Sequence, residues 1–287
     1  GAALGQSAAV IGELHPDLVR RLTAEAVRSA RHVLKMCIRA LDYCPPADID
    51  FGDYLRAIVT ADLDVMPDDG LNYRVAFIDA FRQHGIYPRG LRSLSEESLA
   101  WETVTDALRD YGGLDAVSKR LRDFFNATRW HFCREEQWKA TSKQRADLHK
   151  VLQGELWDYF RDERLQRVTG LDFSIANSFE EVKFQVQALW PIRHQRADGT
   201  TLNQVVFCLL QHTPLTDDQE IWGGSTVIFD LDRQEWKYLI RKPLFDQERP
   251  DGRKTRARKF LADNNSLAAT YGMAGKEEPF AMLHAEL

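Results

Sequence analysis

The sequence predicts an α+β fold, in which an N-terminal α-helical domain is followed by a small antiparallel β-meander with a terminal helix. Two observations lead to this prediction. Apolar residues recur with the helical period of 3.6 from residue 15 to about residue 165, and with a period of two from about residue 179 to residue 241. Because helical and extended segments are segregated along the chain, we do not expect an alternating β-α-β architecture.

The composition narrows the class of protein. The chain has 287 residues, of which 44% are hydrophobic and 10% aromatic, with 38 Lys and Arg against 43 Asp and Glu. These apolar side chains can bury a core, which excludes an intrinsically disordered chain. The formal charge of −5 excludes a general nucleic-acid-binding surface, so nucleic acid is not an expected partner. The length suffices for one large domain or two ordinary ones.

Three features predict a cytoplasmic protein without a membrane partner. No stretch approaches the roughly 18 apolar residues that span a bilayer, and the first residues lack the basic start of a signal peptide. The cysteines show no C-x-x-C spacing, which favours free thiols in a reducing compartment, although a disulfide between distant cysteines stays open. The cysteines are Cys37, Cys44, Cys133 and Cys208.

We expect three parts along the chain. Residues 1–92 form a helical lobe, residues 93–170 form further helices including one long helix, and residues 171–287 form an antiparallel β-sheet module with a C-terminal helix and a loose tail. The boundaries follow the change of period and the glycine and proline positions between periodic segments.

The helical lobe should contain three helices. Pro16 suits the first turn of the first helix, and the prolines at 45–46 end it. A second helix begins near Phe51, and the turn at 67–70 separates it from a third helix over 72–84. The first helix carries an apolar stripe with a period of 3.6 residues: Leu18, Leu22, Val27, Ala30, Val33, Leu34, Cys37, Ile38 and Leu41. The third helix should turn Val75, Ala76, Ile78, Ala80 and Phe81 inward.

The middle part should be helical as well. Helices are expected over about 96–111, 114–128 and 134–167, with a glycine pair at 112–113 between the first two. The third is long and highly charged, and Gly154 in its middle costs about 1 kcal/mol relative to Ala.

The β module should contain four strands. They are expected near 182–188, 205–210, 226–231 and 236–241. Asp198-Gly199 indicates a hairpin turn between the first two strands. Gly223-Gly224 precedes the third strand rather than a helix, which indicates a bulge or a tight strand entry and not a phosphate-binding loop. A short helix over about 254–262 follows, and the tail beyond Asp263 is expected to be loose.

The familiar catalytic and cofactor motifs are absent from the sequence. It has no H-E-x-x-H, no G-x-x-x-x-G-K, no G-x-G-x-x-G after a strand and no G-x-S-x-G. The histidines are scattered; His32 could be a metal ligand or a core residue, but no second ligand lies four residues away. The adjacent carboxylate pairs are typical of helix caps and turns. We therefore predict no catalytic, cofactor-binding or metal-binding residue in this chain.

One segment departs from the acidic character of the chain. Residues 241–259 carry eight Lys and Arg against three Asp and Glu, a local charge of +5 against −10 for the rest. This segment could meet an anion, an acidic partner protein or nucleic acid, or it could contact the acidic helical half of the same chain. The lack of interleaved aromatic residues disfavours nucleic acid.

The stretch from Tyr43 to Tyr87 resembles a known family. The residues that carry the resemblance are Cys44-Pro45-Pro46, Phe51, Ala57-Ile58, Ala61-Asp62, Ala80-Phe81 and Gly85-Ile86. They resemble the end of the helical lobe of gluzincin metallopeptidases of the fungalysin/thermolysin-like group. The similarity is confined to about residues 30–90. The sequence departs from the family pattern at Tyr54, where the family tends to have Ala, and at Ile78, where it has Trp.

The resemblance implies that this chain is a non-catalytic part of a larger protein. In that family the zinc ligands, two His and one Glu, and the general-base Glu lie N-terminal to the matching region, so none falls in this chain and any zinc would lie upstream. The resemblance thus implies the C-terminal portion of a bacterial-type metallopeptidase-like protein, with the N-terminal catalytic region as its partner. Phe51, Ala57, Ile58 and Phe81 would fill the lobe core.

Two other interpretations stay open. The chain could be a stand-alone protein-interaction module that binds a protein partner through the basic segment 241–259. It could also be an enzyme with an unrecognised site between its helical and β halves. The parts of the chain that the resemblance leaves out, from residue 93 onward, have no role assigned by it.

Overall fold

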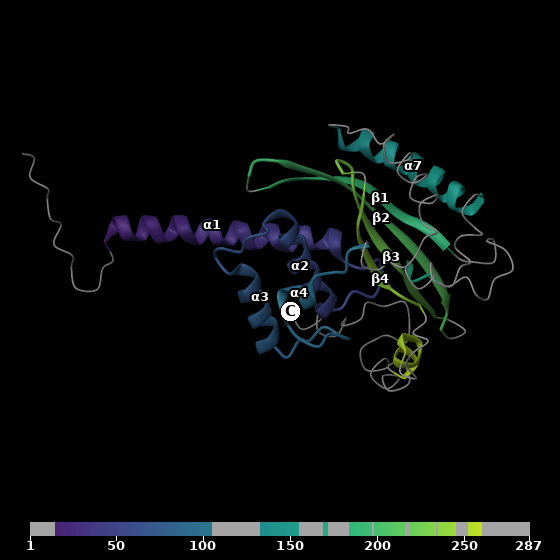
Figure 1. Ribbon diagram of the computed structural model, residues 1–287, viewed down its shortest axis with the longest axis horizontal. Helices are drawn as coiled ribbons and strands as arrows, with labels where there is room; N and C mark the ends of the chain where they lie inside the picture. The colour runs from purple at the N-terminus through teal and green to yellow at the C-terminus, as the bar shows by residue number, and fades with distance from the viewer. Residues whose placement is uncertain are drawn as a thin grey trace, which may run out of the picture.

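The computed structural model describes residues 15–104, 133–154, 169–171, 184–196, 198–215, 219–233, 235–244 and 252–259. A helical lobe packs on one face of a four-stranded sheet, and one long helix extends from the lobe as an arm (Figure 1). The helices are α1 (Pro16–Ala40), the 3₁₀ turn η1 (Leu41–Tyr43), α2 (Phe51–Val65), α3 (Tyr73–Gln83), α4 (Glu96–Leu99) and α7 (Arg134–Gly154). The strands are β1 (Phe184–Gln195), β2 (Thr201–Pro214), β3 (Glu220–Asp230) and β4 (Glu235–Lys242). The predicted α+β class is therefore confirmed.

Helix α2 is the centre of the lobe. It begins with a capping box, in which Asp50 and Asp53 each accept a hydrogen bond from the other's backbone N–H. Ten of its fifteen residues are buried, including Leu55, Ile58 and Val59. A helix buried on most of its circumference needs partners on several sides, and here they are α1, α3, α4 and the sheet.

The predicted lobe core is correct in part. Ala57 and Ile58 are buried as expected. Phe51 is 70% exposed, so its predicted core position is wrong; as the first residue of α2 it lies at the rim of the lobe. Phe81 is half-buried at the edge of the core, and Val75 on α3 faces solvent rather than the interior.

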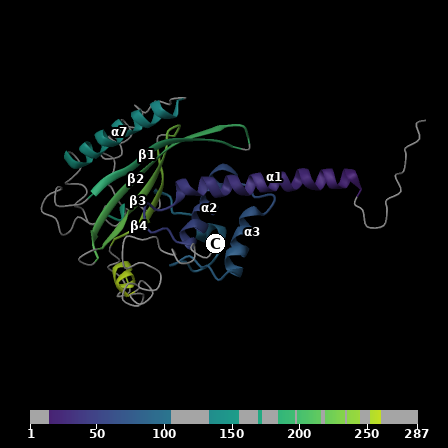
Figure 2. The same cartoon turned by 180° about the vertical axis from the view of Figure 1, so that it is seen from behind.

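The apolar stripe that the sequence predicted on α1 is mostly exposed. Only Met36 and Ala40 are buried on this helix, because the lobe contacts its C-terminal part and the rest extends past the lobe. Figures 1 and 2 show the arm from both sides. The apolar side chains that remain in solvent include Leu18, Val19, Leu22, Val27, Val33, Leu34, Ile38 and Leu41.

The sheet is an antiparallel meander in the order β1-β2-β3-β4. The hairpin at Asp198-Gly199 is confirmed: Arg196 N donates to Thr200 O at 2.8 Å, and Gly199 has a φ of 83°. The glycine pair at 223–224 lies inside β3 rather than before it, which corrects the predicted strand entry. A Cβ on Gly224 would lie 1.9 Å from the carbonyl oxygen of Leu209 on β2, so only glycine fits there.

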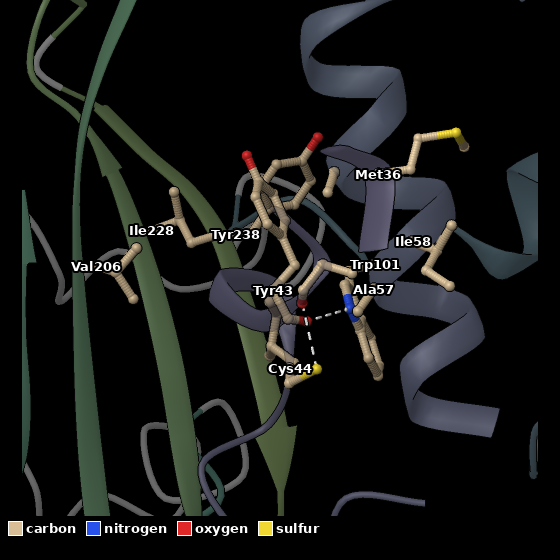
Figure 3. Packing of buried hydrophobic residues seen from close by; sticks show 12 residues of the cluster. Met36, Tyr43, Cys44, Ala57, Ile58, Trp101, Val206, Ile228 and Tyr238 are labelled. Carbon is tan, nitrogen blue, oxygen red and sulfur yellow. Dashed lines mark hydrogen bonds between the residues drawn. The ribbon is translucent and has the colours of Figure 1, made fainter. Parts of the chain in front are cut away.

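One hydrophobic cluster joins the lobe to the sheet (Figure 3). From the sheet, Val206, Ile228, Tyr238 and Ile240 meet the end of α1 and the inner side of α2. Tyr43 is fully buried between the layers. The lobe members are Met36, Ala40, Tyr43, Cys44, Ala57, Ile58, Ala61 and Trp101. Helix α7 lies beside β1, where Arg145 Nη1 donates to the carbonyl of Gln187 at 3.0 Å.

The middle part differs from the prediction where it is described. The helix expected over 96–111 ends at Leu99, because the chain leaves the helix to place Trp101 against the lobe core. Helix α7 confirms the start of the long helix, and residues 253–259 confirm the final one. The rest of the first of these helices from residue 105, the helix over 114–128, the long helix beyond Gly154 and the tail beyond Asp263 lie outside the described residues.

Two further expectations concern cysteines and membranes. All four cysteines are free thiols, with Cys44 and Cys208 buried, Cys37 half-buried and Cys133 exposed. Among the residues that the structure describes, no helix combines the length and the apolar character that a bilayer-spanning segment needs.

The central position of α2 gives a direct stability test. Ile58 has no exposed surface, so Ile58→Ala should lower the free energy of unfolding by about 2–5 kcal/mol. Val75 is 50% exposed, so Val75→Ala should change the free energy of unfolding by less than about 1 kcal/mol. Urea denaturation of both variants measures the difference; equal effects would contradict the placement of α2 in the core.

Candidate functional site: a cationic cleft at the joint of lobe and sheet

A cleft of about 370 Å³ lies where the basic segment meets the lobe. Its walls come from the N-terminal end of α2, the loop at Pro88 and Arg89, the end of β4 and the helical residues 253–259. The charged lining residues are Asp48, Asp50, Asp53, Arg56, Arg89, Arg241, Lys242, Arg253 and Arg256. Six cations against three carboxylates give the cleft an excess of positive charge.

The carboxylates of the cleft already have partners from the basic segment. Lys242 Nζ forms an ion pair with Asp53 and lies 3.6 Å from Asp50 Oδ2. Arg253 pairs with Asp48 and also donates to the carbonyls of Trp222 at 2.7 Å and Pro243 at 2.8 Å. The sequence left several partners open for segment 241–259. These ion pairs show that the segment contacts the acidic helical half of the same chain.

Arg56 differs from the other cations of the cleft. Its Nε donates to the carbonyl of Leu99 at 3.0 Å and its Nη2 to the carbonyl of Ala100 at 3.3 Å. Its guanidinium lies 3.7 Å from the ring centroid of Trp101, a cation–π contact. No carboxylate of the described residues forms an ion pair with Arg56, and the groups that its guanidinium contacts directly are two carbonyls and an aromatic face.

The electrostatics of the cleft follow from this arrangement. Burial is the largest cause that lowers the pKa of Arg56, to about 10, and the nearby charge of Arg241 lowers it further. Asp53 and Glu102 act in the opposite direction. Glu102 is itself 3.2 Å from Arg241 Nη2. The cleft therefore holds two guanidinium groups of like charge that Asp53 and Glu102 partly compensate, and a bound anion would add to this compensation.

A second polar cluster fastens the sheet to α2. Tyr43 OH donates to Asp64 Oδ2 at 2.6 Å, and Gln204 Nε2 donates to the same oxygen at 2.9 Å. Lys237 from β4 forms an ion pair with the other carboxylate oxygen of Asp64. Burial lowers the pKa of Lys237 to about 8 and raises that of Tyr43 well above its ordinary value. Each carboxylate oxygen is engaged and the groups lie between packed layers, so we interpret the cluster as a structural cross-link.

A third cluster contains His32, which the sequence left between metal ligand and core residue. Arg74 is buried and donates to Asp62 at 2.9 Å and to Glu96 at 2.6 Å. His32 Nε2 lies 3.9 Å from Asp62 Oδ1, and its ring contacts that of Tyr73 at a centroid distance of 4.3 Å. His32 therefore belongs to a helix-joining network. In the described ranges, no group of three or more His, Cys, Asp or Glu side chains is arranged to hold a metal ion.

The sequence indicated four of the six cations named in the lining of the cleft. The charge of segment 241–259 pointed to Arg241, Lys242, Arg253 and Arg256. It missed Arg56 and its aromatic support, because an arginine in an apolar helical stretch carries no local signal of the carbonyls that it will meet 43 and 44 residues later.

The Asp64–Lys237 pair predicts a non-additive mutational effect. Lys237→Met leaves a buried carboxylate without its cation and should cost about 3–5 kcal/mol. Adding Asp64→Asn to this variant removes the stranded charge and should restore part of that stability. Thermal and urea unfolding of the two single variants and the double variant measure the coupling; simple additivity would show that the pair is not a cross-link.

The chain was also compared with known proteins. No family model matches it, and no curated protein or solved structure is detectably similar to it. The resemblance of residues 43–87 to gluzincin metallopeptidases stays a prediction.

Proposed function

We propose that this chain is the non-catalytic C-terminal portion of a larger metallopeptidase-like protein, and that α1 is the element by which it docks on the upstream catalytic region. One observation carries the proposal: the apolar stripe of α1 is left uncovered along the arm. The catalytic chemistry, and any zinc, would belong to the upstream region.

The exposed apolar surface involves α1 and the η1 turn that follows it. Five of its large side chains are between 45% and 64% exposed: Leu18, Leu22, Leu34, Ile38 and Leu41. The polar side of the helix carries Arg20, Arg28, Arg31 and Lys35. Single exposed leucines are ordinary on protein surfaces, but several large exposed apolar side chains on one helix are typical of an interface.

The size of this face suits a packed domain contact. A helix of 25 residues is about 38 Å long. Burying one Leu or Ile side chain contributes about 1.5–3 kcal/mol, so a few such residues suffice for a stable contact. The resemblance to gluzincins suggests which region would pack on α1. The residues that carry the resemblance directly follow α1, and in that family the zinc-binding helices precede this region.

The alternative of a stand-alone interaction module acting through segment 241–259 has weaker support. Lys242 and Arg253 are engaged with carboxylates of the lobe, and Arg258 Nε donates to the carbonyl of Leu215 at 3.1 Å. A segment used in this way to hold the lobe on the sheet presents less charge to a protein partner.

The test uses the longer protein encoded by the natural gene. We expect H-E-x-x-H upstream, with a further Glu downstream of it. Leu34→Glu combined with Ile38→Glu should weaken docking and reduce peptide hydrolysis at least about tenfold, the equivalent of about 1.4 kcal/mol. Arg28→Glu combined with Lys35→Glu, on the polar side of the same helix, is the matched control and should retain activity.

Three outcomes would overturn the proposal. The first is an upstream region without a zinc motif. The second is equal activity of the apolar-face and polar-face variants. The third is a stable dimer of the present chain that the apolar-face variant dissociates in sedimentation experiments, because the stripe would then serve a second copy.

A further inference from the structure

We propose that the cationic cleft binds an oxyanion, the phosphate or carboxylate group of a small ligand, between the guanidinium groups of Arg56 and Arg241. This inference is independent of the proposed function and of the resemblance, because it rests on the residues of this chain that line the cleft.

The first support is that some charges of the cleft are paired with one another and others are not. Asp50 and Asp53 cap α2 and neutralise Lys242, while Asp48 is paired with Arg253. These ion pairs close the joint between the lobe and the basic segment. They leave the positive charge of Arg56 and Arg89 in the same cleft without an ion-pairing carboxylate among the described residues.

The second support is the preorganisation of Arg56. Two of its nitrogens are anchored on the carbonyls of Leu99 and Ala100, and its plane rests on the buried ring of Trp101. Its Nη1 donates to no described residue. A guanidinium fixed in this way loses little conformational entropy when it binds an oxyanion, and its planar fork matches carboxylate and phosphate oxygens.

The third support is the proximity of Arg241. This residue lines the same cleft, and its positive charge is one of the causes that lower the pKa of Arg56. Bringing two guanidinium groups together in a half-buried place costs free energy, which an anion between them would return. Glu102 offsets part of the charge of Arg241 at 3.2 Å, but it is 63% exposed and lies outside the cleft lining.

The volume limits the ligand. About 370 Å³ is near the lower end of the range for small-molecule sites, so the cleft fits a small ligand with one anionic head group. Nine of the fourteen named lining residues are charged, which favours recognition by ion pairs over hydrophobic burial.

Inorganic phosphate and acetate are the probes, titrated separately into the 287-residue chain at constant ionic strength with chloride as the balancing anion. We expect at least one probe to bind saturably. Calorimetry and the NMR chemical shift of the Trp101 indole N–H measure this binding. Which probe binds more tightly identifies the head group. Arg56→Gln and Arg241→Gln should each weaken binding at least about tenfold, whereas Arg82→Gln, an exposed pair member on α3, should leave it unchanged.

Arg241→Gln keeps the test valid if Arg56→Gln fails to fold. The Arg241 side chain is 35% exposed, so its replacement should leave the melting temperature nearly unchanged. The absence of saturable binding of both probes would overturn the proposal, as would binding that Arg241→Gln and Arg82→Gln weaken equally.

Discussion

The buried joint between the helical lobe and the sheet is the constraint on which the rest of the structure depends. Tyr43 lies at its centre, where a bulky ring with a polar end must be buried without losing its hydrogen bond. Its hydroxyl meets Asp64, and its carbonyl accepts the indole N–H of Trp101 at 2.9 Å. The hydroxyl of Thr226 on β3 adds a hydrogen bond to Cys44 O at 2.8 Å. Polar groups and apolar burial thus fix the same relative position of the two layers.

Both candidate functional features follow from this joint. Placing Trp101 in the core brings the carbonyls of Leu99 and Ala100 to Arg56, and the docked sheet brings the end of β4 to the same place. The cleft is therefore a by-product of how the layers meet. The same packing engages only the C-terminal part of α1, which leaves large apolar side chains in the remainder of the helix exposed.

The sequence predicted what local patterns determine. Alternation and short apolar runs located the four strands, Asp198-Gly199 located the hairpin, and the proline and glycine positions located α2 and α3. Contacts between distant segments could not be predicted in this way. The apolar period of α1 shows that the helix has an apolar face, but not whether other parts of this chain cover that face. Phe51 fits the helical pattern of α2 although it lies at the rim of the lobe. Lys237 and Asp64 are 173 residues apart, so no local signal connects them; for the cleft, charge composition indicated the basic wall and left Arg56 unrecognised.

The most direct test of the joint is native-state hydrogen exchange. The backbone N–H of Trp101 donates to the Thr60 hydroxyl at 2.9 Å, so its exchange reports on the lobe, and the amides of β2 around Val206 report on the sheet. If the joint makes lobe and sheet one cooperative unit, both sets should exchange with the same free energy and the same denaturant dependence, as in global unfolding. Exchange of the Trp101 amide by a separate opening, several kcal/mol lower in free energy than that of the β2 amides, would contradict this account.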